Sequence, residues 1–160
     1  MKGFWHIIGM GMIAGMRSMA APAIVSDYLA QRPWRGLIGL PFSLLSVRKI
    51  SQVLKLFALG EMIGDKIPGV PHRISFPALL GRGLSGIVVG ATVGAVRGNN
   101  RNISAIAGGL AAIAAAYGSY HLRIAASKHL QVPDPVIGAV EDALVIGSGI
   151  GLLELTPESA

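Results

Sequence analysis

The amino-acid sequence predicts an all-α, polytopic membrane protein, and its composition carries that prediction. Of the 160 residues, 52% are hydrophobic and only 14% are charged, whereas soluble domains carry about 25% charged residues. Mean hydropathy is +0.59. Because a helix needs about 20 apolar residues to cross a bilayer, we expect one domain over residues 1–155 with about five transmembrane helices, four being the alternative. Residues 156–160 are expected to form a flexible tail.

The apolar runs define the expected elements in chain order. The first run is interrupted only by Arg17 and Asp27, and the sequence Arg32–Trp34 that follows is typical of a helix leaving the bilayer. Residues 36–46 are apolar but too short to cross, so we expect them to be interfacial or re-entrant. The five expected spans are residues 4–30, 48–67, 77–97, 103–126 and 135–154.

Glycines recur at every fourth position in several of these runs. Such spacing leaves a smooth groove along one helix face, and close backbone approach favours helix association in lipid. The sequence therefore predicts helix packing within the chain or between copies, so a homo-oligomer is one expected outcome. The glycines concerned are Gly11, Gly15, Gly60, Gly64, Gly86, Gly90, Gly94, Gly147 and Gly151.

Charged residues inside the expected spans fall at one level of the membrane. Successive spans alternate in direction, so the end of the second span shares a leaflet with the start of the third, and the end of the fourth with the start of the fifth. Each charge inside a span costs at least about 2.5 kcal/mol on insertion scales, so these groups must be paired or hydrated. The expected cluster consists of Arg17, Glu61, Asp65, Arg82, Arg123, Glu141 and Asp142.

This cluster has two interpretations. In the first, it lines a hydrated site for an ion or small charged solute, which predicts a transporter or channel-like protein. In the second, the charges are dry salt bridges between helices, which predicts a structural or assembly protein whose glycine faces bind partner helices. A lipid-acting enzyme with a carboxylate-bound divalent metal is least favoured, so we expect neither catalysis nor a cofactor.

The order of the charges also bears on topology. The distribution of basic residues favours an N-terminus outside and a C-terminus inside a prokaryotic inner membrane. An arginine followed by acidic residues occurs in the first two spans and again in the last two, which suggests an inverted repeat of the kind found in transporters.

Residue types exclude other classes of site. The chain has no cysteine, which excludes disulfides, zinc-thiolate sites and cysteine nucleophiles. The net charge of +6 comes from basic residues at the edges of apolar runs, a pattern that favours contact with anionic lipid over nucleic acid. His121 lies two residues before Arg123 and could join the charged cluster; an interfacial or hydrogen-bonded histidine is the alternative.

Four segments of the sequence resemble one known family. They are Ala14–Pro22 (AGMRSMAAP), Gly60–Pro68 (GEMIGDKIP), Arg82–Gly86 (RGLSG) and Val140–Asp142 (VED). Together they are similar to the bacterial integral-membrane family catalogued as domain of unknown function 4126, and the resemblance covers essentially the whole chain. It implies a membrane protein and brings no established activity, although it marks the same acidic and basic residues as the charge pattern.

Overall fold

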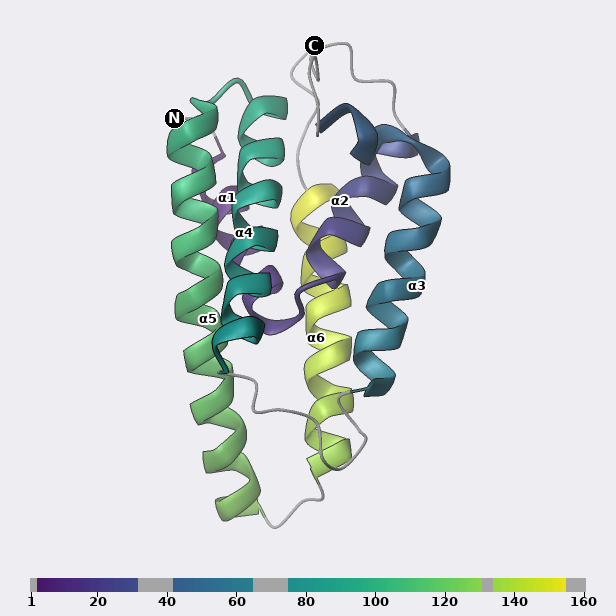
Figure 1. Ribbon diagram of the computed structural model, residues 1–160. Helices are drawn as coiled ribbons and strands as arrows, with labels where there is room; N and C mark the ends of the chain where they lie inside the picture. Colours follow the sequence, from purple (N-terminus) through teal and green to yellow (C-terminus); the bar gives the residue numbers. More distant parts are fainter. Residues whose placement is uncertain (1–2, 32–41, 65–74, 131–133, 155–160) are drawn as a thin grey trace.

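A computed structural model describes residues 3–31, 42–64, 75–130 and 134–154, and this part of the chain is helical with short connections (Figure 1). The predicted all-α class is confirmed. The expected tail and most of the segment 36–46 lie outside the described residues. The elements are α1 (Phe4–Met16), α2 (Ala20–Gln31), a short 3₁₀ helix η1 (Phe42–Ser46), α3 (Arg48–Gly64), α4 (Phe76–Val96), α5 (Arg101–Leu130) and α6 (Asp134–Glu154).

Three helices, α4, α5 and α6, have the length and apolar composition needed to cross a membrane. Helix α1 is apolar too, but its 13 residues extend only about 20 Å. Helix α3 is longer, with 17 residues, and carries several charges. In Figure 1 the helices α3 to α6 alternate in direction, and α1 and α2 lie among them.

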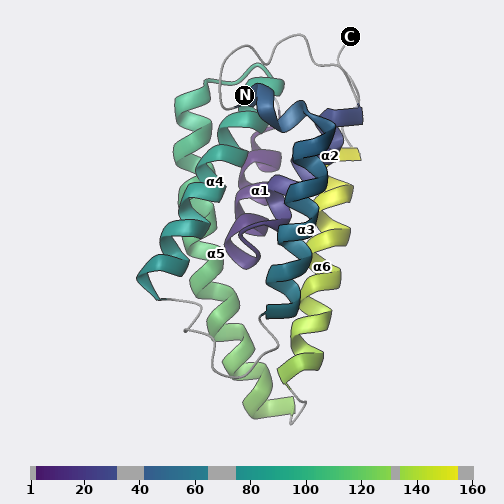
Figure 2. The same cartoon turned by 45° about the vertical axis from the view of Figure 1, so that its right-hand side comes forward.

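The first apolar run is not one helix, as the sequence predicted, but two helices that form a hairpin (Figures 1 and 2). The start of α1 lies at Arg97, because a Cβ added to Gly3 would sit 2.8 Å from the Arg97 guanidinium. Tyr28, near the end of α2, also interacts with Arg97. Burial lowers the pKa of the Arg97 guanidinium, and the charge interaction with Tyr28 raises it. In a continuous helix, Gly3 and Tyr28 would be about 38 Å apart. The chain therefore turns back between the two helices.

The turn follows from Pro22. A helix running through this region would need the residue 22 amide to donate to the carbonyl of Ser18, but proline has no amide proton and its ring clashes with that carbonyl. Pro22 instead occupies the first turn of α2, where no intrahelical donor is required. Arg17 takes an extended conformation, with φ −140° and ψ 109°, and ends α1. The prediction of a single span over residues 4–30 was wrong because it gave no weight to this proline.

Glycines bring α1, α4 and α5 into close backbone contact. A Cβ at Gly11 would lie 2.6 Å from the Gly108 carbonyl oxygen, and one at Gly86 would lie 2.5 Å from the same atom. Gly15, Gly90 and Gly94 make equally close approaches to α5. The other glycines of the predicted packing set have open space beside them: Gly60, Gly64, Gly147 and Gly151.

The exterior of the bundle is apolar and its interior carries charge. Phe76 is 77% exposed and Leu122 72% exposed, whereas Arg17 is 1% exposed. A soluble protein would show the reverse distribution, so this arrangement suits a lipid environment.

The hairpin changes the expected topology. The start of α1 and the end of α6 lie at the same end of the bundle, where Gly9 faces Leu152. The two ends coincide because the hairpin returns the chain to the side from which α1 starts. The predicted orientation of the termini in the membrane stays a prediction. Helices α5 and α6 are continuous as described and offer no counterpart to the hairpin, so the arrangement gives no support to the inverted repeat.

Candidate ion site at the tip of the helix hairpin

The residues Arg17–Met19 between α1 and α2, here called the hairpin tip, lie within the bundle, with Arg17 buried and Ser18 and Met19 half-buried. The Ser18 carbonyl oxygen accepts a hydrogen bond of 2.5 Å from Ser85 Oγ of α4. Ser85 is nine residues into α4, or about 14 Å from its start. Asp142, which contacts the tip from α6, is eight residues into that helix, or about 12 Å. The tip therefore lies about halfway along helices of about 30 Å.

Arg17 is the largest fully buried side chain among the described residues, and Asp142 neutralises it. Arg17 Nη2 lies 2.7 Å from Asp142 Oδ1. The Arg17 amide also donates to the Ile13 carbonyl, at 2.8 Å, which places the residue at the C-terminus of α1. A positive charge is favourable there because the peptide dipoles leave that end partly negative.

Glu61, from the last turn of α3, closes the other side of the tip. Its carboxylate accepts hydrogen bonds from the Ser18 amide (2.9 Å), the Met19 amide (2.8 Å) and Ser18 Oγ (3.0 Å). The first amides of a helix have no partner within it, so Glu61 caps α2 from a distant part of the chain. Its negative charge also meets the partly positive end of that helix.

A second ion pair adjoins the first. Arg123 of α5 lies with Nη1 3.6 Å from Glu141 Oε2 of α6, and both side chains are mostly buried. The Arg123 guanidinium passes over Gly138, where an added Cβ would come within 3.4 Å of it. Since Glu141 and Asp142 are adjacent, α6 uses one turn to hold arginines from two different helices.

The remaining residues of the predicted cluster are placed less directly. Arg82 is 4% exposed and lies one turn before Ser85, on the part of α4 that contacts the tip. Asp65 lies outside the described residues. His121 makes an edge-on ring contact with Tyr120. Among the described residues, no group of three His, Asp or Glu side chains is placed to hold a metal ion.

The sequence did not single out the polar groups of the tip itself. The Ser18 and Met19 amides are available to donate to Glu61 because α2 begins after them. The Ser18 carbonyl can accept the hydrogen bond from Ser85 because Pro22, four residues later, has no amide proton to donate to it. The signal in the sequence was Pro22 five residues after Arg17, a charge and a helix breaker together inside an apolar run. Glycine spacing could not indicate it, since Gly11 and Gly15 lie on α1 alone.

A model of one protein family matches residues 5–155, under the description Domain of unknown function (DUF4126). No curated protein and no solved structure is significantly similar to the chain. The match covers both helices of the hairpin and every charged residue of the site. The chain belongs to this family, DUF4126.

Proposed function

We propose that this protein is a small membrane transporter or channel-like protein in which the hairpin tip and the charges around it bind an ion or small charged solute. The observation that carries the proposal is the turn between α1 and α2, from Met16 to Ala20, which lies about halfway along α4 and α6. Irregular backbone at membrane depth is tolerated only where it is buried in protein or lines a cavity. Transporters direct the ends of helices that stop within the membrane at charged solutes.

The donors at the tip suit an anion. The Ser18 and Met19 amides and the Ser18 hydroxyl converge on one carboxylate, that of Glu61, at the partly positive end of α2. A solute anion can take over these donors when the Glu61 side chain moves away. Because Glu61 belongs to α3, such an exchange would couple solute binding to the position of that helix.

A structural function is the second candidate, and one observation supports it. Each described carboxylate of the cluster has a partner within the chain: Glu61 on the tip amides, Asp142 on Arg17 and Glu141 on Arg123. Charges satisfied in this way can simply fasten helices together. The two candidates differ in whether water reaches the tip.

Cysteine labelling in sealed vesicles tests the difference, because the natural chain has no cysteine. Ser18→Cys changes one atom at the tip and leaves the backbone amides unchanged. Asn99→Cys, in the turn between α4 and α5, is the positive control. Ser148→Cys, on the exposed apolar surface of α6, is the matched negative control. The reagent is a membrane-impermeant maleimide.

The transport proposal expects Ser18→Cys to react nearly as fast as Asn99→Cys, and an inorganic anion in the buffer to slow the reaction. Ser148→Cys should stay unlabelled, since a thiol facing lipid is neither hydrated nor ionised. If Ser18→Cys is as unreactive as Ser148→Cys with the reagent on either side of the membrane, while Asn99→Cys reacts from its own side, the tip is dry. The structural function would then replace transport.

A further inference from the structure

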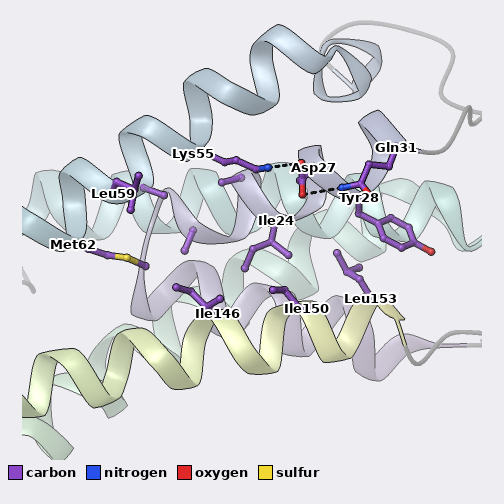
Figure 3. Close-up of a pocket in the computed structure, with 13 residues that line it drawn as sticks. Ile24, Asp27, Tyr28, Gln31, Lys55, Leu59, Met62, Ile146, Ile150 and Leu153 are labelled. Carbon is purple, nitrogen blue, oxygen red and sulfur yellow. Dashed lines mark hydrogen bonds and ion pairs between the residues drawn. The ribbon is translucent and has the colours of Figure 1, made fainter.

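A groove opens between α3 and α6, with α2 as its floor (Figure 3). Its volume is about 480 Å³. Helices α3 and α6 make little direct contact, so the groove separates them. Leu59 and Met62 of α3 line one wall, Ile146 and Ile150 of α6 line the other, and Ile24 lies on the floor. This surface is here called the α3/α6 groove.

Polar groups gather at one end of the groove only. Lys55 Nζ lies 2.5 Å from Asp27 Oδ1, and Gln31 Nε2 donates to Asp27 Oδ2 at 3.0 Å. Gln31 is the last residue of α2, so this end is level with the ends of the helices. The opposite end, at Met62, is near the middle of the bundle. The groove therefore has the polarity of one lipid leaflet, polar at the helix ends and apolar inward.

The side of α3 that lines the groove repeats this polarity. Lys55, Leu59 and Met62 follow one another at helical spacing and all line the groove. Arg48, seven residues before Lys55, is on the same side of the helix about 10 Å nearer its start. Against these cations, Asp27 is the one carboxylate that lines the described groove.

From these observations, we infer that the α3/α6 groove binds one acyl chain of an anionic phospholipid, with the lipid phosphate at Lys55. The half-exposed Lys55 can change partners at little cost, because exposed ion pairs contribute little stability.

Photocrosslinking tests this inference on the full chain in phosphatidylcholine vesicles. The probe is phosphatidylglycerol with a diazirine in its acyl chain, and the same probe with a choline headgroup is the neutral comparison. Ile150→Trp fills the groove, and Leu144→Trp places the same side chain on the exposed surface of the same helix. Lys55→Gln removes the proposed phosphate contact, and Lys49→Gln removes an exposed charge outside the groove.

We expect crosslinks of the anionic probe to concentrate on the groove residues. Ile150→Trp should reduce these crosslinks about tenfold, and Lys55→Gln, which loses one charged contact, should reduce them by a similar factor. Leu144→Trp and Lys49→Gln should leave the crosslinks unchanged. Labelling spread evenly over exposed surfaces such as Leu110 of α5, or equal labelling by the choline probe, would overturn the inference. A dimer that Ile150→Trp separates would also overturn it, since the groove would then hold a second copy.

Discussion

The two sides of this helical bundle are held together by different means. On one side, α1, α4 and α5 approach so closely that a side chain at Gly15, Gly86 or Gly108 would meet the backbone of a neighbouring helix. On the other side, α3 and α6 are separated by a groove, and the glycines of these helices that the sequence marked for packing face open space. The same four-residue glycine spacing therefore has opposite consequences on the two sides.

Charge joins the two sides. Helix α6 reaches α1 and α5 through Asp142 and Glu141, and α3 reaches the hairpin through Glu61. Close glycine packing needs a matching surface on both helices, whereas an ion pair fixes only one point and leaves room beside it. The open side can therefore hold a cavity, while the glycine side cannot. This difference predicts which substitutions each side tolerates.

The largest expected effect comes from Asp142→Asn. Removing one member of a buried ion pair leaves the Arg17 charge uncompensated, at a cost of about 3–5 kcal/mol. Replacing both with apolar residues, as in Arg17→Met with Asp142→Leu, should recover much of that loss. Unfolding of the detergent-solubilised protein by heat measures the change. If Asp142→Asn alone leaves the unfolding temperature unchanged, the charges do not join the two sides.

Gly108→Ala should have the next largest effect. The added Cβ would meet the Gly86 carbonyl and the Gly90 Cα of α4, and because these are backbone atoms that cannot move aside, we expect a loss of about 3 kcal/mol. Gly147→Ala is the matched control, since its Cβ meets open space and alanine favours helix by up to about 1 kcal/mol. Equal stability of the two variants would contradict the proposed contrast between the sides.

Glu61→Gln should destabilise the hairpin by a smaller amount. The amide oxygen can still accept the hydrogen bonds from Ser18, but the bond from the Met19 amide and the charge opposite the N-terminus of α2 are lost, at about 1.5 kcal/mol. Hydrogen exchange should therefore quicken at the Ser18 and Met19 amides while the α4 and α5 amides keep their rates. Uniform acceleration across the chain would show that Glu61 supports the whole bundle and not the hairpin alone.

The sequence predicted the fold class and most helix boundaries because composition and apolar length determine them. It also selected Arg17, Glu141 and Asp142, which the structure places together, since charges inside apolar runs are conspicuous. The hairpin was missed because two short helices and one long span have the same composition, and only Pro22 distinguishes them. The groove could not be predicted either, because Leu59 and Ile150 read as ordinary apolar residues until the distance between α3 and α6 is known.

Lys55→Gln should have the smallest effect on stability, and it separates the groove from the framework of the fold. The ion pair with Asp27 is about half exposed, so its loss should cost below about 0.5 kcal/mol. Asp27 also retains Gln31 as a donor. The unfolding temperature should stay near that of the natural protein in neutral detergent, while stabilisation by added phosphatidylglycerol should weaken. A large loss of stability in detergent alone would mean that this ion pair fastens α3 to α2. Glu61 would then not be the main polar contact that holds α3 on the open side.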